Sequence, residues 1–140
     1  MTIRPAIIPS LRYENARAAI NFLCKAFGFT QHAIYAHPEN DSRIMHAELL
    51  FAGQMVMLAS EEQTPFAAAA PLKSVREVGG NTQTLYVVLE DVDGHAEQAC
   101  KAGARIFMQP DDQSYGGRSY SAHDPEGYAW TFGSYDPFAK

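Results

Sequence analysis

Two stretches of the chain carry the hydrophobic pattern of an amphipathic helix, and the two stretches are alike. Residues 15–28 and 91–103 place apolar side chains every three or four positions, so that one stripe of each helix faces a core. Asn15 and Asp91 stand where these helices begin, and either side chain can accept hydrogen bonds from first-turn amides. The tripeptide Cys-Lys-Ala recurs near the end of both stretches. The pattern therefore indicates an internal repeat, in which the chain contains two copies of one structural unit.

Strand-like runs flank the two helices in the same order. One run precedes each helix and three runs follow it. The predicted strands are residues 6–13, 30–36, 43–51 and 54–59 in the first copy, and 84–89, 104–109, 118–123 and 129–133 in the second. Gly53 and Gly127 precede the last strand of each copy, where a turn favours glycine. This order predicts an α+β fold of two tandem βαβββ modules, and the alternative is an unrelated α+β sandwich whose repeat is accidental.

The two modules are expected to form one domain that spans residues 1–140. Module one covers residues 1–60, a linker covers 61–83, and module two covers 84–140. The linker is rich in Glu, Ala, Pro and Gly, which suits a surface segment with one short helix. Each small sheet has a helix on one side and needs a partner on the other. Two such modules are therefore expected to form a cupped cavity.

Composition narrows the class of protein. The chain has 140 residues, of which 46% are hydrophobic and 19% are charged, as in an ordinary globular domain. A formal net charge of -5 and scattered basic residues argue against a nucleic-acid partner, which needs a concentrated basic surface. No apolar run is long enough for a membrane span or a secretory signal, so we expect a cytoplasmic location and no membrane partner. Cys24 and Cys100 are predicted to be buried free thiols.

Several motifs together resemble those of a known superfamily. They are Pro9-Ser10-Leu11-Arg12-Tyr13, Ala26-Phe27-Gly28-Phe29, His46-Ala47-Glu48-Leu49, Leu89-Glu90-Asp91-Val92-Asp93, Tyr115-Gly116-Gly117-Arg118 and Asp124-Pro125-Glu126-Gly127-Tyr128-Ala129-Trp130. With these motifs the chain resembles the vicinal-oxygen-chelate superfamily of glyoxalases, bleomycin-resistance proteins and extradiol dioxygenases, and in particular a glyoxalase-like branch. The last motif also has a physical basis, because Asp124 can accept backbone N–H groups of its own turn and Trp130 can bury its ring under a helix.

The resemblance implies a divalent metal ion held by four side chains, one from the first and one from the last strand of each module. Counting from the motifs places these positions at Ile8, Met57, Thr84 and Thr131. An aliphatic side chain, a thioether and two hydroxyls are poor ligands for zinc, nickel, iron or manganese. We therefore predict no metal site and no cofactor, with a divalent metal as the alternative.

His46 and Glu48 are the candidate catalytic residues. They lie two apart in a predicted strand, so alternation places both on one face with Ile44 and Leu50, whereas Met45 belongs to the other face. A histidine beside a carboxylate can act as a general base pair, or as half of an unusual metal site. The alternative is a hydrogen-bonded polar pair that orders the strand and the linker.

Further candidates would bind a ligand. Arg118 and Tyr120 share a face of one predicted strand, and the guanidinium of Arg118 suits a carboxylate or phosphate group of a ligand. The alternative for Arg118 is a structural ion pair with an acidic residue, for which the candidates are Asp111, Asp112 and Asp124. An apolar pocket wall with a few hydroxyls is predicted from Tyr13, Met57, Thr84, Tyr86, Tyr115 and Thr131. Surface positions are expected for His32, His37 and His95.

Two classes of function follow from these observations. The first is a small-molecule-binding protein without the usual metal site, similar to the bleomycin-resistance branch. The second is a glyoxalase-type lyase or isomerase, or a dioxygenase, with a relocated metal or with acid–base chemistry by His46 and Glu48. In domains that this chain resembles, a second copy of the chain usually completes the cupped cavity, so a homodimer is expected.

Overall fold

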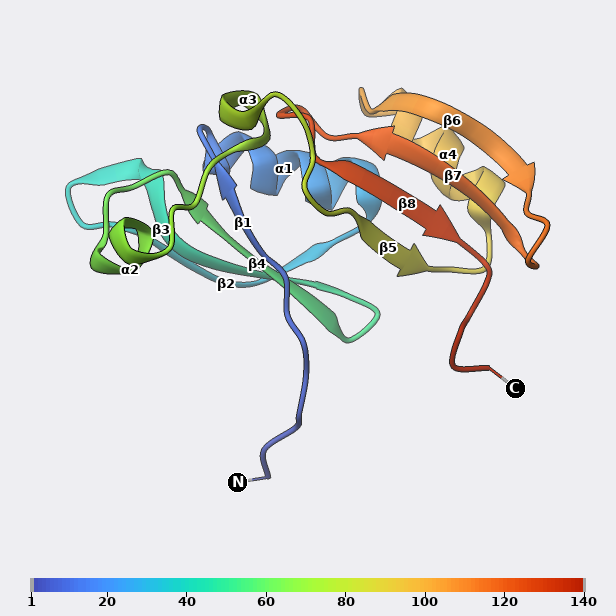
Figure 1. The fold of residues 1–140 in the computed structure, drawn as a ribbon, viewed down its shortest axis with the longest axis horizontal. Coiled ribbons are helices and arrows are strands. Elements are labelled where there is room, and N and C mark those ends of the chain that lie inside the picture. Colours follow the sequence, from blue (N-terminus) through green and yellow to red (C-terminus); the bar gives the residue numbers. More distant parts are fainter. Residues whose placement is uncertain (1, 140) are drawn as a thin grey trace.

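The computed structural model describes residues 2–139, and its elements follow the predicted order (Figure 1). Module one comprises β1 (Ser10–Tyr13), α1 (Ala16–Phe27), β2 (Thr30–His37), β3 (Asn40–Phe51) and β4 (Gln54–Ser60). Module two comprises β5 (Leu85–Val88), α4 (Val92–Lys101), β6 (Arg105–Asp112), β7 (Arg118–His123) and β8 (Ala129–Gly133). The linker contains two short helices, α2 (Pro65–Ala69) and α3 (Val75–Val78), where one was predicted. The α+β fold of two βαβββ modules is confirmed.

The two sheets have the same topology. Their strand orders are β1-β4-β3-β2 and β5-β8-β7-β6. In each sheet the first strand pairs in parallel with the last, and the remaining pairs are antiparallel. The register repeats as well, since Ser10 lies opposite Met57 and Tyr86 lies opposite Thr131. The duplication indicated by the helices therefore extends to the pairing of the strands.

Both long helices begin at the predicted capping residues. The side chain of Asn15 accepts a hydrogen bond from the amide of Ala18 at 3.1 Å, and that of Asp91 accepts one from Gly94 at 3.0 Å. Gly28 closes α1 in the left-handed conformation, with φ at 84°, which glycine adopts without steric cost. None of the helices in the described part of the chain is long and apolar enough to cross a membrane.

The modules pack together through α1 and α4, each of which covers one face of its own sheet (Figure 1). Phe27, near the end of α1, places its ring centroid 5.6 Å from that of Trp130 and 4.7 Å from that of Phe132, both on β8. All three rings are fully buried. Each such ring stabilises the fold by about 1.5–3 kcal/mol relative to an exposed position. Trp130 thus packs beneath a helix, as predicted.

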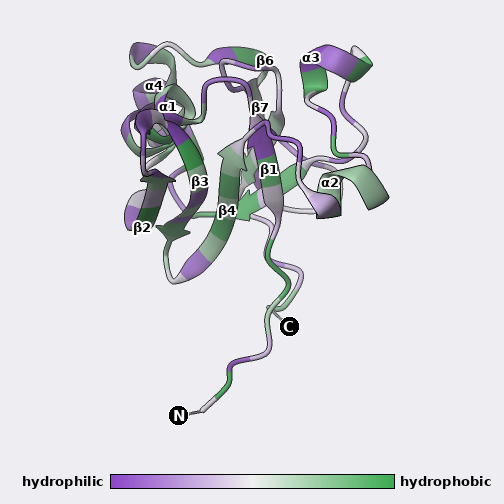
Figure 2. Ribbon diagram, turned by 90° about the vertical axis from the view of Figure 1, so that its left-hand side faces the viewer, coloured by the Kyte–Doolittle hydropathy of each residue, from purple (hydrophilic) through white to green (hydrophobic). Residues whose placement is uncertain are grey.

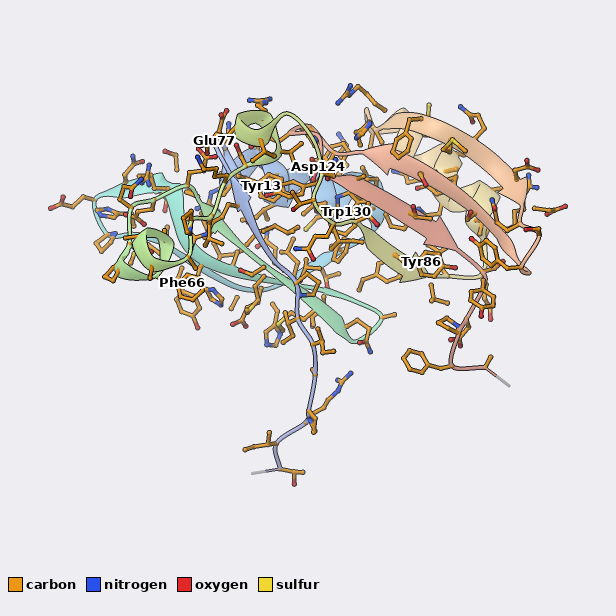
Figure 3. All side chains as sticks on the ribbon, in the orientation of Figure 1. Tyr13, Phe66, Glu77, Tyr86, Asp124 and Trp130 are labelled. Atoms are coloured by element: carbon orange, nitrogen blue, oxygen red, sulfur yellow. The ribbon has the colours of Figure 1, made fainter. Side chains whose placement is uncertain are left out.

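Asp124 makes a second connection between the modules. Its carboxylate accepts hydrogen bonds from the amides of Glu126 and Tyr128 at 3.0 and 3.1 Å, as the turn motif predicted. It also accepts hydrogen bonds from the hydroxyl of Tyr13 on β1 and from Nε1 of Trp130 on β8, at 2.5 and 3.2 Å. Figure 3 shows Tyr13, Asp124 and Trp130 gathered near the centre of the molecule. The turn between β7 and β8 therefore holds the first strand of module one.

Two expectations are corrected. β1 begins only at Ser10, and residues 2–9 have no regular structure. The chain before Pro9 runs away from the body of the molecule (Figures 1 and 2), whereas the carbonyl of Pro9 still accepts a hydrogen bond from the amide of Met57 at 2.9 Å. Pro9 has no amide hydrogen and cannot donate to a neighbouring strand, which favours a strand start after it. Both cysteines are free thiols, but Cys24 is only half-buried and Cys100 is exposed on α4, whereas both were predicted to be buried.

Candidate functional site

Each sheet has one face covered by its helix and one face without a helix, which we call its outer face. The first outer face is formed by Tyr35, Met45, His46, Glu48 and Met57, and the second by Tyr86, Phe107, Met108, Ser121 and Thr131. Large side chains on these faces remain exposed, with exposed fractions of 59% for Tyr35, 52% for Met45 and 61% for Met108. The outer faces are therefore the surfaces on which the fold can contact a ligand or another chain.

His46 and Glu48 meet on the first outer face, as predicted. His46 Nε2 lies 2.8 Å from Glu48 Oε2, and the ring of Tyr35 stacks on the imidazole with centroids 6.0 Å apart. His32, which is exposed as expected, brings its Nε2 to 3.9 Å from the other carboxylate oxygen. Glu48 stands opposite Met57 of β4. This geometry allows a proton to pass between the carboxylate and an imidazole.

A β-bulge interrupts the alternation beside this pair. Ile44 was predicted to share the face of His46, with Met45 on the opposite face. Instead Ile44 is 1% exposed in the core and Met45 is 52% exposed. The register between β2 and β3 shifts here, so that His46 lies opposite Tyr35 while Ile44 lies opposite Ala36, the next residue of β2. The extra residue of β3 turns Met45 to the outer face.

The second outer face carries hydroxyl groups on an apolar surface. Thr131 lies between Tyr86 and Ser121 in the strand register, and Met108 lies beyond Ser121. Ser121 Oγ and Thr131 Oγ1 are 2.7 Å apart and hydrogen-bonded. The hydroxyl of Tyr86 donates to the carbonyl of Tyr135 at 2.7 Å, and burial raises the pKa of Tyr86. This row can contact an apolar ligand and orient it through the hydroxyls of Ser121 and Thr131.

Arg118, Tyr120 and Tyr13 point toward the helices rather than to the outer faces. Arg118 and Tyr120 share a face of β7 as predicted, but α4 covers that face. Arg118 donates two hydrogen bonds to Asp93 of α4, at 2.9 and 3.0 Å, and one to Asp112 at 3.3 Å. The bridge lowers the pKa of Asp93. Tyr120 and Tyr13 are 1% and 0% exposed. These three residues therefore serve the fold, and Asp93 is a partner of Arg118 that the sequence did not suggest.

Two other side chains occupy unexpected or peripheral places. His95 was expected at the surface but is half-buried between the modules, where its ring nitrogens bond to Tyr120 and to the carbonyl of Phe27. Tyr115 is 58% exposed in the turn between β6 and β7, where it packs edge-on against Tyr135 at 5.2 Å. Tyr115 therefore lies at the border of the second outer face rather than on it.

The four positions that the resemblance assigns to metal ligands carry no histidine, cysteine or carboxylate side chain. Ile8 precedes β1 and Thr84 precedes β5, so neither lies in a paired strand. Met57 and Thr131 occupy equivalent positions of β4 and β8. Within residues 2–139 no three His, Cys, Asp or Glu side chains are grouped so that they could hold a metal ion. The side chains at these positions do not fit the divalent cation of the superfamily.

Comparisons with known sequences agree with this architecture. The sequence profile of the Glyoxalase/Bleomycin resistance protein/Dioxygenase superfamily matches residues 7–132. An uncharacterized protein of Mycobacterium bovis is 30% identical over 133 residues, which make up 95% of this chain and 85% of that protein. An uncharacterized protein of Mycobacterium tuberculosis is also 30% identical over 133 residues, which make up 76% of its length.

Solved structures share the same fold. TioX from Micromonospora sp. ML1 is 27% identical with a TM-score of 0.70, over 93% of this chain and 98% of that chain. The fosfomycin resistance protein FosX from Mesorhizobium loti is 14% identical with a TM-score of 0.64, over 97% of this chain and 96% of that chain. A glyoxalase I mutant from Zea mays is 16% identical with a TM-score of 0.67, over 91% of this chain and 44% of that chain. At these low identities, the likeness to FosX and to glyoxalase I concerns the fold alone.

Proposed function

The chain belongs to the Glyoxalase/Bleomycin resistance protein/Dioxygenase superfamily, and from this membership we propose that it binds a small organic molecule on its outer faces. We propose further that it does so without a metal ion, as a bleomycin-resistance-like binding protein rather than as an enzyme. The observation that carries this proposal is the pair Met57 and Thr131, which stand at equivalent strand positions where the superfamily places metal ligands. A thioether and a hydroxyl suit contact with an organic ligand better than coordination of a hard cation.

The outer faces also support a homodimer. Each outer face is open, and the exposed side chains Tyr35, Met45, Phe107 and Met108 form apolar surface that a soluble chain usually covers. We propose that the first outer face of one copy approaches the second outer face of its partner, so that two copies enclose the ligand. Analytical ultracentrifugation is expected to show a dimer, and Met108→Glu is expected to shift it toward the monomer. A monomeric wild-type chain at micromolar concentration would contradict this part of the proposal.

Metal analysis and ligand binding test the main proposal together. The purified protein is analysed for transition metals by mass spectrometry before and after treatment with EDTA. Binding of planar aromatic compounds, with bleomycin among them, is then measured by calorimetry on both preparations. We expect far less than one metal ion per chain, and a dissociation constant that EDTA leaves unchanged. Stoichiometric metal together with loss of binding after chelation would refute the hypothesis that the chain binds its ligand without a metal ion.

A matched pair of variants locates the binding site. Met57→Lys places a charge in the first outer face and is expected to weaken binding at least about tenfold, because an unpaired charge is costly in a closed apolar site. Phe66→Lys also replaces an apolar side chain by lysine, but at an exposed position of the linker, and is expected to leave binding unchanged. Equal effects of the two substitutions would argue against a site on the outer faces.

An enzyme remains the second candidate function, because of one specific contact. His46 and Glu48 are hydrogen-bonded at 2.8 Å on an open face, which supports acid–base chemistry by this pair or a relocated metal beside it. Such an enzyme would be a glyoxalase-type lyase or isomerase, or a dioxygenase. Activity toward an α-oxoaldehyde–thiol adduct or a catechol that His46→Ala abolishes would favour this candidate. The two free thiols fit a reducing compartment, and we retain the cytoplasm as the proposed location.

A further inference from the structure

Two adjoining cavities lie between β1 and the linker, next to the first outer face, since Ser10 lines the smaller one and stands opposite Met57. The larger has a volume of about 630 Å³ and the smaller about 270 Å³, and both are bordered by Arg12, Pro71, Leu72 and Lys73. None of the residues that define the outer faces lines either cavity. Figure 2 shows α2 and α3 on the side of the molecule where β1 lies, and Ala67 of α2 and Val75 and Val78 of α3 line the cavities. The volume of the larger cavity is in the range of small-molecule sites, about 300–1,000 Å³, and that of the smaller lies just below this range.

The shared border presents two cations without carboxylate partners. The guanidinium of Arg12 donates to the carbonyl of Ser60 at 3.3 Å, and among residues 2–139 no carboxylate lies within 4.0 Å of it or of the ammonium of Lys73. Arg43, at the far side of the larger cavity, is different, because the carbonyl of Glu61 binds it at 2.7 Å and Glu62 lies 4.0 Å away. A half-buried guanidinium with several free N–H groups is a good partner for an oxyanion.

The carboxylates of the larger cavity are not paired with these two cations in the described chain. Glu62 faces Arg43, and Glu77 accepts a hydrogen bond from the amide of Ser74 at 3.4 Å in the capping box of α3. Burial raises the pKa of Glu61, and the neighbouring Glu77 raises it further. One carboxyl oxygen of Glu61, Oε1, is buried without a hydrogen-bond partner in the described chain. Glu61 and Glu77 therefore line the larger cavity without forming an ion pair with Arg12 or Lys73 in the described chain.

The smaller cavity has an apolar part and a polar part. Its lining includes the apolar side chains of Leu11, Leu72, Val75, Val78 and Leu85 and the ring of Tyr128, together with the polar residues Ser10, Asn81, Thr82 and Gln83. The hydroxyl of Tyr128 accepts from the amide of Arg12 at 3.2 Å and donates to the carbonyl of Arg12 at 2.7 Å. These two bonds hold the backbone of Arg12 in place before a ligand arrives, which reduces the entropic cost of binding.

From this arrangement we propose a second binding site, in which the linker and β1 hold an apolar small molecule that carries one oxyanion group. The apolar body occupies the smaller cavity and the oxyanion contacts Arg12 and Lys73. A carboxylate and a phosphate monoester share the chemistry that these cations recognise. The site differs from the one under Proposed function in its lining, since none of the ten side chains named as forming the outer faces lines either cavity.

The full chain is titrated with benzoate, followed by NMR of its methyl groups. Benzamide is the uncharged control of the same shape, and acetate is the control without an apolar body. We expect saturable shifts at Leu72, Val75 and Val78, with benzoate binding at least about tenfold more tightly than either control, because a charge-assisted hydrogen bond is stronger than a neutral one. Phenyl phosphate in a parallel titration shows which oxyanion is preferred. Benzoate that binds no more tightly than benzamide would overturn the proposal.

Variants test whether benzoate binding depends on Arg12 and Lys73. Arg12→Gln is expected to raise the Kd for benzoate at least about tenfold, whereas Arg12→Lys keeps the charge and loses less. Lys73→Gln, in an exposed part of the linker, tests the same cavity if Arg12→Gln fails to fold. Arg17→Gln removes a cation on α1 that faces Asp41, and should leave the Kd unchanged. Met108→Glu, on the second outer face, should also leave benzoate binding intact, so either site can fail without the other. A Kd for benzoate that neither Arg12→Gln nor Lys73→Gln changes would refute the proposed second site.

Discussion

His95 connects the two modules through both nitrogens of its ring. Nε2 lies 2.8 Å from the carbonyl oxygen of Phe27 at the end of α1, and Nδ1 lies 2.6 Å from the hydroxyl of Tyr120 on β7. A carbonyl oxygen can only accept, so Nε2 carries a proton, and in the neutral ring Nδ1 then accepts from the hydroxyl of Tyr120. The ring also packs on Phe132, with centroids 4.3 Å apart. The neutral imidazole is therefore the form that the folded chain selects.

Replacing His95 by alanine is expected to destabilise the fold substantially. The substitution removes two hydrogen bonds worth about 1 kcal/mol each and leaves the buried hydroxyl of Tyr120 unpaired, which costs about 1–3 kcal/mol. Lost contact with Phe132 adds about 0.5–1.5 kcal/mol. Because these contributions overlap, we expect a loss of roughly 2–5 kcal/mol at pH 8. Adding Tyr120→Phe to His95→Ala removes the unpaired hydroxyl, so the double variant should lose less than the sum of the two single variants.

Stability should also depend on pH through His95. Burial lowers the pKa of His95, although the bond to Phe27 and the charge of Asp91 oppose this shift. In the unfolded chain the pKa is about 6.5, so below that pH the unfolded state binds more protons than the folded state. The free energy of unfolding therefore falls as the pH drops below about 6.5, and this contribution is fully present at higher pH. The His95→Ala variant should show a smaller fall than the wild type.

Urea unfolding followed by the fluorescence of Trp130, the single tryptophan, measures these quantities at pH 8 and pH 5.5. His37→Ala, at the end of β2, is the matched control and should change the free energy of unfolding by no more than about 0.5 kcal/mol. A loss below about 1 kcal/mol for His95→Ala, or a pH dependence equal to that of the wild type, would refute this account of His95.

Three further predictions concern other parts of the fold. Asp124→Ala leaves the Tyr13 hydroxyl and the Trp130 indole without their acceptor, and should lower the free energy of unfolding by about 3–5 kcal/mol, measured by thermal or urea unfolding. Asp136→Ala, at the exposed C-terminal turn, should lower it by less than about 1 kcal/mol. Gly117→Ala should lower the free energy of unfolding by at least about 2 kcal/mol, because φ of Gly117 is 71° and a Cβ would lie 2.6 Å from the amide nitrogen of Tyr135. Gly103→Ala should cost less, because φ of Gly103 is 98° but a Cβ there would have no atom within 4 Å. Equal losses for the two variants would contradict the steric argument. Cys100 should react with a maleimide before Cys24, whose pKa is raised by burial, as peptide mapping of partly labelled protein will show; faster labelling of Cys24 would contradict the exposures seen here.

The modules and their helices could be predicted from the sequence because short-range signals specify them. Asn15 and Asp91 cap their helices through amides three residues away, and Gly28 ends α1 by its own conformational freedom. The Asp124 turn likewise satisfies its carboxylate with neighbouring amides. Such features need no knowledge of distant segments, and the order in which they occur was sufficient to indicate two βαβββ modules.

Side-chain positions that depend on distant partners required the tertiary structure. Alternation showed that Arg118 and Tyr120 share a face, but only the packing of α4 decided that this face is covered. The bulge that exposes Met45 arises from pairing with β2, and the position of His95 arises from contact with the end of α1. The sequence alone determined which elements form and in which order. The tertiary structure decided which side of each element is buried, because burial depends on contacts between segments that are far apart in the chain.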